Sequence, residues 1–384
     1  MVLRTLRDRV RFDRNEFSGA FGDIGTDFPL IVGMILVCGL DATSVLVLYG
    51  ALQIFTGLSY GMPMPVQPLK AMAVIVITQK LSANVLYGGG LAIGMVMLLL
   101  TVTGAMDWVA NAVPKSVVRG IQFGLGLQLA ALARKDYVPA DGKTGFVIAS
   151  VAFLIAILLL GNRRFPPALL IIFLGVAYAL FTKVSPASLA HSFGFRLPQI
   201  HHPSWSDIAT GFVVLALPQL PLSLGNSILA SRQIAEDLFP RRHVTVRKIS
   251  LTYSLMNLVN PFFGGVPTCH GSGGIAGHYA FGARTGGSVV IAGTLYAVFG
   301  LFFGAGFRLI VDLFPRPVLG VILLFEALAL IKLVRDMAVS AADFTIVLLV
   351  GLIAFGVPYG YVLGLVIGTA LAYWLRRKPA GFAA

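Results

Sequence analysis

The stretch Tyr60-Gly61-Met62-Pro63-Met64-Pro65-Val66-Gln67-Pro68-Leu69-Lys70-Ala71 interrupts a hydrophobic sequence of membrane length with three prolines, a glutamine and a lysine. A proline lacks a backbone N–H, and the residue before a proline disfavours the α-helical conformation. We therefore expect residues 62–66 to be extended and a short helix to begin near Pro65 or Pro68, with Lys70 about one turn inside it. Irregular backbone persists at membrane depth only where protein buries it or where it lines a polar cavity. The stretch thus predicts a polar site inside a membrane protein.

The second half of the chain repeats this pattern. Residues 253–267 match residues 49–63 in spacing, and the matched pairs are Tyr49 with Tyr253, Gln53 with Asn257, Gly61 with Gly265, and Pro63 with Pro267. The donor-rich run Thr268-Cys269-His270-Gly271-Ser272-Gly273-Gly274 follows the second copy. Interrupted hydrophobic segments at corresponding places in two halves indicate a transporter binding site.

The composition excludes a soluble protein. Hydrophobic residues make up 57% of the 384 residues and charged residues only 12%, against about 25% charged residues in soluble domains. The two cysteines, Cys38 and Cys269, lie in apolar segments and imply no disulfide framework. The basic N-terminus lacks a small-residue cleavage site, so it reads as a cytoplasmic lead-in and not as a signal peptide.

Hydrophobic segments predict an all-α polytopic membrane protein with 14 transmembrane segments. The third (65–79) and tenth (268–281) are shorter than the ~20 residues of a full span, and both follow the irregular runs. With the N-terminus in the cytoplasm, twenty of the 29 Lys and Arg residues fall on the cytoplasmic side and eight on the outer side, Lys70 being set apart inside the membrane. This bias places both termini in the cytoplasm. It explains the net charge of +13 without a nucleic-acid partner.

Seven segments on each side of a polar linker predict a 7+7 inverted repeat, because an odd number per half reverses the orientation. The expected divisions are a basic N-terminus (1–16), a first repeat (17–184), a linker (185–205) and a second repeat (206–376). The linker histidines, His191, His201 and His202, have no acid or cysteine at ligand spacing, which favours a solvated loop over a metal site. We expect no metal and no cofactor.

Several groups inside the hydrophobic segments could act on a substrate. An ionisable Lys70 near the bilayer midplane costs at least ~2.5–3.5 kcal/mol, so we expect it to bind an anionic substrate, with a structural ion pair to Asp23 or Asp27 as the alternative. The glycines around Ser272 let a ligand approach the backbone or, alternatively, let helices pack tightly. In the eighth segment (206–230), Gln219, Ser223 and Asn226 are polar, and Gln122 and Gln128 in the fifth read as interhelical contacts.

Three acids are candidates for carrying a coupling proton. Asp23 and Asp27 are four residues apart and share a helix face, and such a pair in a low dielectric favours binding of a proton. Asp27 lies deeper and is the stronger candidate, whereas Asp23 has a solvated position at the cytoplasmic interface as its alternative. Glu326 in the twelfth segment is the third candidate.

Four motifs together resemble the MOT-type molybdate transporter family, a branch of the sulfate permease superfamily that lacks a STAS domain. They are Gly22-Asp23-Ile24-Gly25-Thr26, residues 63–71, Gln219-Leu220-Pro221-Leu222 with Asn226-Ser227, and residues 267–274. The resemblance implies a core domain (segments 1–4 and 8–11) that slides against a gate domain (segments 5–7 and 12–14). It also implies that substrate binds between the third and tenth helix starts. The substrate-binding candidates are Thr26, Gln67, Lys70, Gln219, Asn226, Thr268, Cys269, His270, Gly271, Ser272, Gly273 and Gly274.

These observations predict a secondary transporter of the inner membrane that imports a tetrahedral oxyanion by elevator-like alternating access, with protons as the hypothesised coupling ion. Molybdate is the first substrate, and sulfate or tungstate is the alternative. A nucleobase permease of the same fold is less favoured, because the eighth and tenth segments carry Gln219 and His270 where such a protein needs carboxylates. An intramembrane enzyme using Cys269 and His270 has no apparent third orienting group. A homodimer and a monomer both remain open.

Overall fold

The computed structural model describes residues 9–106, 108, 112–159, 167–182, 193–313 and 315–377, and it is mostly helical. The first half contains α2 (Arg14–Gly19), α3 (Ile24–Cys38), α4 (Ala42–Tyr60), β1 (Val66–Pro68), α5 (Lys70–Gln79), α6 (Ala83–Thr103), α8 (Lys115–Leu132) with η1 (Ala133–Tyr137), α9 (Gly142–Leu158) and α10 (Pro167–Thr182). The second half begins with a long helical series made of α12 (Trp205–Gly211), η2 (Phe212–Ala216), α13 (Leu217–Leu222), η3 (Ser223–Ala230) and α14 (Ser231–Leu238). It continues with α15 (Val246–Val259), η4 (Asn260–Phe263), β2 (Thr268–His270), α16 (Ser272–Ala280), α17 (Gly287–Leu313), α18 (Arg316–Lys332), η5 (Leu333–Met337), α19 (Ala341–Gly356) and α20 (Gly360–Arg377).

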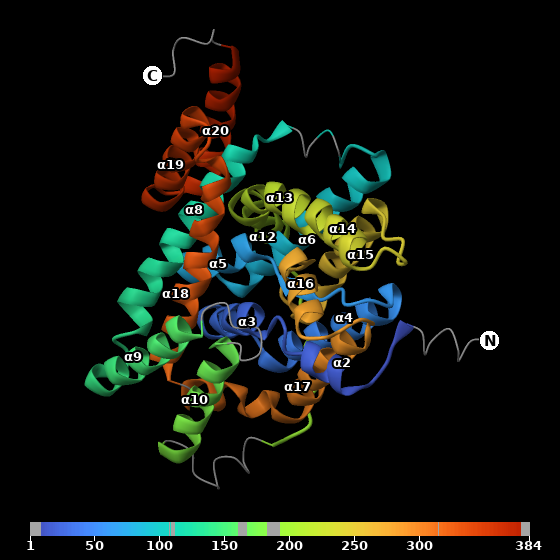
Figure 1. Ribbon diagram of the computed structural model, residues 1–384, viewed down its shortest axis with the longest axis vertical. Helices are drawn as coiled ribbons and strands as arrows, with labels where there is room; N and C mark the ends of the chain where they lie inside the picture. Colours follow the sequence, from blue (N-terminus) through green and yellow to red (C-terminus); the bar gives the residue numbers. More distant parts are fainter. Residues whose placement is uncertain are drawn as a thin grey trace, which may run out of the picture.

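The helices pack in two groups, which lie side by side in Figure 1. In one group α8 packs against α18, α19 and α20, and α9 packs against α18 and α10. In the other group α4 packs along α17, and α6 packs against α12 and α15. The α4–α17 contact depends on small residues, since a Cβ on Gly293 would lie 2.5 Å from the carbonyl oxygen of Gly50. The division of the helices into a core domain and a gate domain stays a prediction.

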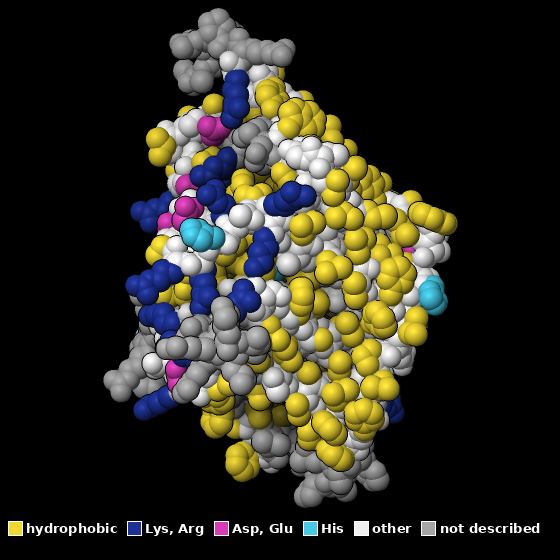
Figure 2. Space-filling model, turned by 90° about the vertical axis from the view of Figure 1, so that its right-hand side faces the viewer, with side chains coloured by type: hydrophobic (Ala, Val, Ile, Leu, Met, Phe, Trp, Pro, Cys, Tyr) yellow, Lys and Arg dark blue, Asp and Glu magenta, His cyan; other side chains and the backbone are white. Residues whose placement is uncertain are grey.

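The surface has the distribution of a membrane protein. Six helices within the described residues are long and apolar enough to cross a membrane: Ala42–Tyr60, Ala83–Thr103, Lys115–Tyr137, Trp205–Leu238, Gly287–Gly304 and Arg316–Met337. Figure 2 shows Lys and Arg side chains gathered along one flank, while hydrophobic side chains cover most of the remaining face. The chain is therefore a multi-pass membrane protein. The full count of fourteen spans stays a prediction.

The two irregular runs meet as a buried two-stranded antiparallel sheet. β1 pairs with β2 so that Val66 lies opposite His270, Gln67 opposite Cys269, and Pro68 opposite Thr268. The extended stretches before both half-helices are thus present. The helix begins two residues after Pro68, so the alternative start near Pro65 is wrong: the backbone N–H of Leu69 still donates to the carbonyl oxygen of Pro267 at 3.0 Å. The sheet therefore holds the chain extended up to Leu69, and Lys70 is the first residue of α5 and not a turn inside it.

The described part of the linker packs against the protein. The backbone N–H of His201 donates to the carbonyl oxygen of Phe262 at 2.8 Å, and its ring lies 5.0 Å from that of Tyr87. His202 is exposed. A solvated loop therefore describes His202 but not His201, and His191 lies outside the described residues.

Candidate functional site

A small cavity lies at the junction of the two strands and the two half-helices. Successive side chains of a strand point to opposite faces, so the opposed residues Gln67 and Cys269 share one face. Both line a void of about 30 Å³, room for roughly one or two water molecules. Its other lining residues are Lys70, Gln122, Leu125, Gln219, Leu222, Asn226, Ser227 and Leu330. Five of the sequence-predicted site residues therefore meet here: Gln67, Lys70, Gln219, Asn226 and Cys269.

Gln219 caps the first half-helix. Its Oε1 accepts hydrogen bonds from the backbone N–H groups of Ala71 at 2.9 Å and Met72 at 3.3 Å. Its Nε2 donates to Ser223 Oγ at 3.1 Å. The first N–H groups of a helix are an anion site when they are free, but at α5 a neutral amide oxygen satisfies two of them. Lys70, at the same helix start, is the cation that α5 brings to the cavity.

Asp23 holds the corresponding position at the second half-helix. Its carboxylate accepts a hydrogen bond from Gln67 Nε2, and a Cβ on Gly274, in the first turn of α16, would overlap that carboxylate. Each repeat thus contributes one side chain to the half-helix of the other repeat. Gln219 of α13 contacts the start of α5, and Asp23, the N-cap residue of α3, lies at the start of α16. The solvated position considered for Asp23 is wrong, since its residue is only 7% exposed.

The glycines after β2 have separate roles. A Cβ on Gly271 would overlap the Oε1 atom of Gln67, and Gly274 leaves room for both Asp23 and Gln67. A Cβ on Gly273 would meet nothing within 4 Å. Tight packing therefore requires Gly271 and Gly274, whereas Gly273 borders open space. Ser272 Oγ donates to Asn226 Oδ1 at 3.0 Å and so ties α16 to the wall of the cavity.

His270 and Thr268 support the strand and do not line the cavity. His270 is fully buried, with Nε2 at 2.8 Å from Thr252 Oγ1 and its ring 5.5 Å from the ring of Tyr60. Asn257 binds the peptide group of Thr268, accepting from its N–H at 2.9 Å and donating to its carbonyl oxygen at 2.6 Å. The side chains of Thr26 and Glu326 lie outside the described part of the structure.

A second cavity lies between α3, α4, α16 and α17. It has a volume of about 300 Å³, and its polar lining residues are Asp23, Asp27, Gln53, His278 and Tyr296. The hydroxyl of Tyr49 donates to Asp27. Asp23 is the residue of this cavity that also touches Gln67, so the amide of Gln67 connects the acidic cavity with the small central one.

A larger, cationic cavity joins the central one. This vestibule has a volume of about 550 Å³ and includes Lys115, Arg119 and Arg376 in its lining. It shares Gln122, Leu222 and Asn226 with the central cavity. The sequence assigns its three cations to the cytoplasmic side. The cationic vestibule therefore lies next to the cavity at the junction of the half-helices, with the three shared residues between them.

Gln122 and Ser227 are lining residues that the sequence did not assign to the site. Gln122 was expected to be an interhelical contact. The only feature of the sequence that points to Gln122 is an amide side chain in a hydrophobic segment. Gln128 has the same feature, yet it bridges Thr78 Oγ1 and the carbonyl oxygen of Ala354. The folded structure is needed to tell the two glutamines apart: Gln122 lines the cavity, and Gln128 is bonded to Thr78 and to the backbone of Ala354.

Two opposed half-helices inside a multi-pass protein, reached through a cationic vestibule, define a membrane transport protein. The fold is shared with solved transporters at low sequence identity. The transmembrane domain of a cyanobacterium bicarbonate transporter, BicA, superposes with a TM-score of 0.68 at 15% identity, covering 95% of this chain and 98% of that one. The murine anion transporter Slc26a9 in its inward-facing state superposes with a TM-score of 0.71 at 13% identity, covering 98% of this chain and 70% of that one.

The chain belongs to the molybdate transporter family. The family model described as "Molybdate transporter of MFS superfamily" matches residues 15–129 and 211–330. Molybdate transporter 2 of Arabidopsis thaliana is 33% identical, with 86% of this chain and 82% of the relative covered. Molybdate transporter 1 of the same plant is also 33% identical, with 94% and 88% covered. The family resemblance predicted from the sequence is confirmed, and so is a transporter in preference to an enzyme.

Proposed function

We propose that the protein imports molybdate across the inner membrane, with sulfate and tungstate as the alternative substrates. The observation that carries this proposal is the lining of the central cavity. Lys70 supplies a positive charge, and Asn226, Gln122 and Ser227 bring amide and hydroxyl groups. Among the described residues that line this cavity there is no carboxylate. Charge-assisted hydrogen bonds from such groups replace the hydration of a dianion.

The position of the cavity supports alternating access. Gln122, Leu125 and Leu330 come from the α8 and α18 side, and the other lining residues come from the opposite helix group. The void holds only one or two waters, so a tetrahedral oxyanion requires it to widen toward the vestibule. We infer that the core group (segments 1–4 and 8–11) slides against the gate group (segments 5–7 and 12–14) in a 14-span, 7+7 inverted repeat, and that the vestibule is open to the cytoplasm.

Molybdate is placed first because of the relatives. The two Arabidopsis proteins at 33% identity are named molybdate transporters. Sulfate and tungstate have the same shape and charge, so the donors of the cavity bind them by the same contacts. The proposal assigns substrate binding to the polar lining residues Gln67, Lys70, Gln122, Asn226, Ser227 and Cys269. Gln219, which caps α5, and His270, Thr268, Gly271 and Gly274 hold the strands and half-helices in place.

We infer further that a proton accompanies the anion and that Asp23 carries it. Asp27 was the stronger candidate from the sequence, but Asp23 is the acid that contacts Gln67 and the first turn of α16. An ionised Asp23 neutralises the positive end of α16 and repels a dianion. A proton on Asp23 removes both effects, so proton and anion strengthen each other's binding. The titratable groups near Asp23 are Asp27 on its own helix, Tyr49 on α4, Cys269 on β2, His278 on α16 and Tyr296 on α17. Lys70 on α5 acts on Cys269 from the central cavity.

Uptake of labelled molybdate by reconstituted vesicles tests the function. We expect saturable uptake, stimulated by an inward proton gradient, with competition by tungstate and weaker competition by sulfate. Uracil serves as the competitor for a nucleobase permease of the same fold. Strong inhibition by uracil, or no uptake of any of the three oxyanions, contradicts the proposal.

A further inference from the structure

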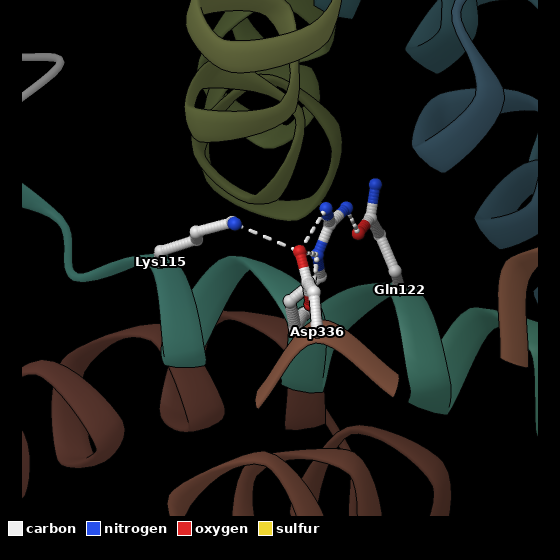
Figure 3. A network of polar contacts seen from close by, with 4 residues as sticks. Lys115, Gln122 and Asp336 are labelled. Carbon is white, nitrogen blue, oxygen red and sulfur yellow. Dashed lines mark hydrogen bonds and ion pairs between the residues drawn. The ribbon is translucent and has the colours of Figure 1, made fainter. Parts of the chain in front are cut away.

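The amide of Gln122 has one defined orientation. Arg119 Nη1 donates to Gln122 Oε1 at 2.9 Å. A guanidinium group has only donors, so the amide atom that faces it must be the carbonyl oxygen. The NH₂ group therefore points the other way, as Figure 3 shows. Within the residues that the structure describes, this NH₂ group has no hydrogen-bond partner, although Gln122 is only 7% exposed.

Arg119 is itself held in place. Its Nε lies 3.1 Å from both carboxylate oxygens of Asp336, and its Nη2 lies 2.6 Å from Asp336 Oδ2. Lys115 Nζ lies 2.8 Å from the same oxygen. A guanidinium group bound through two nitrogens to one carboxylate has a fixed plane. Asp336 lies in η5, which packs against α8, so this contact fixes the Arg119 group that orients Gln122 (Figure 3).

The other amides of the cavity are engaged differently. Gln219 bonds to α5 and Ser223 through both its atoms, Gln67 donates to Asp23, and Asn226 accepts from Ser272. All of these residues belong to the core side. Gln122 is the polar residue that α8 contributes to the cavity lining, and it also lines the vestibule. The NH₂ group of Gln122 therefore belongs to a residue that borders both cavities, and it has hydrogen bonds left to donate to a ligand there.

We propose that Gln122 is a specificity-determining residue that donates a hydrogen bond to an oxygen of the bound oxyanion from the gate side, and that Arg119 and Asp336 are its positioning residues. The inference rests on the proposed function. An oriented NH₂ group offers a donor and no acceptor, so it suits an oxyanion whose oxygens are all unprotonated. Hydrogen phosphate carries an O–H that needs an acceptor, and the oriented amide of Gln122 offers it none. Gln122 thus selects molybdate, tungstate and sulfate against phosphate.

The experiment measures molybdate binding to the purified full-length protein by isothermal titration calorimetry, with and without excess phosphate. For Gln122→Ala we expect at least about a tenfold weaker affinity, because a hydrogen bond to a charged group is lost. Gln122→Glu keeps the shape and the contact with Arg119 but has no NH₂ group, so it weakens binding at least as much and replaces the alanine variant should that variant not fold. Gln128→Ala is the matched control on the same helix, and its affinity stays within about twofold.

The positioning role of Arg119 is tested by the ratio of phosphate affinity to molybdate affinity. In Arg119→Ala the amide of Gln122 is free to turn its oxygen toward the site, so phosphate competes at least about tenfold better relative to molybdate. Arg335→Ala removes the same charge from an exposed position and leaves this ratio unchanged. Wild-type affinity in both Gln122 variants, or an unchanged ratio in Arg119→Ala, overturns the inference. A wild-type protein that binds none of the oxyanions contradicts the proposed function instead.

Discussion

Gln53 and Asn257 hold the two strands by the same contact. The side-chain amide of Gln53 accepts from the backbone N–H of Val66 at 3.0 Å and donates to its carbonyl oxygen at 2.9 Å. Asn257 makes the same pair of bonds to Thr268. The two amides were paired by sequence spacing alone, and both lie in the helix that precedes the irregular run. The repeat in the sequence thus corresponds to a repeated way of satisfying backbone groups inside the membrane.

Replacing Gln53 with alanine destabilises the protein. The substitution leaves the N–H of Val66 buried without its partner, while the carbonyl oxygen of Val66 keeps the hydrogen bond from the Tyr49 hydroxyl. One buried group without a partner costs about 1–3 kcal/mol. We expect a clearly lower melting temperature in detergent and a reduced yield of folded protein. Gln233→Ala removes an exposed amide that donates to Asp237, and it leaves the melting temperature unchanged. Equal melting temperatures for the two variants contradict the role of Gln53.

Gly271→Ala disrupts the site through Gln67. The added methyl group overlaps the Gln67 amide, so Gln67 must leave its contact with Asp23 or β2 must shift. We expect loss of molybdate binding by at least about tenfold, the effect of losing one or two buried hydrogen bonds at the site. Gly273→Ala is the control in the same helix turn, since its methyl group meets nothing within 4 Å. It keeps a wild-type melting temperature, and a stronger folding defect in Gly273→Ala than in Gly271→Ala contradicts the packing described above.

The prolines and the repeated tyrosine and amide spacing were enough to predict two extended runs facing each other. The ends of the half-helices were not predictable, because the hydrogen bond from Leu69 to Pro267 joins residues far apart in the chain. The same holds for Gln219 and His270, which looked like ligand donors. One caps α5 and the other bonds to Thr252. A polar residue in an apolar segment indicates that it has a partner, and only the packing shows whether that partner is backbone or substrate.

Replacing Lys70 with alanine weakens anion binding. Lys70 brings a positive charge to the cavity at the start of α5, and a partly desolvated charge pair is worth about 2–4 kcal/mol. We expect a loss of molybdate affinity of more than about tenfold, measured by titration of the purified protein. Lys80→Ala removes an exposed lysine at the other end of the same helix and has little effect. Unchanged affinity in Lys70→Ala shows that the lysine has a structural role only.

Asp23 makes molybdate binding depend on pH. A proton on Asp23 favours the dianion, so the affinity of the wild-type protein falls as the pH rises and Asp23 ionises. The change is about 5- to 150-fold, the usual range for coupling between two sites. Asp23→Asn cannot ionise, and we expect it to keep a nearly constant affinity across the same pH range and to lose the stimulation of uptake by a proton gradient. Asp27→Asn is the matched variant one turn further along α3. Asp27 accepts a hydrogen bond from Tyr49, whereas Asp23 accepts the one from Gln67, so we expect this variant to retain the pH dependence. If the pH dependence disappears in Asp27→Asn but persists in Asp23→Asn, the role of Asp23 is contradicted. Asp27, the residue that the sequence alone favoured, is then the proton carrier.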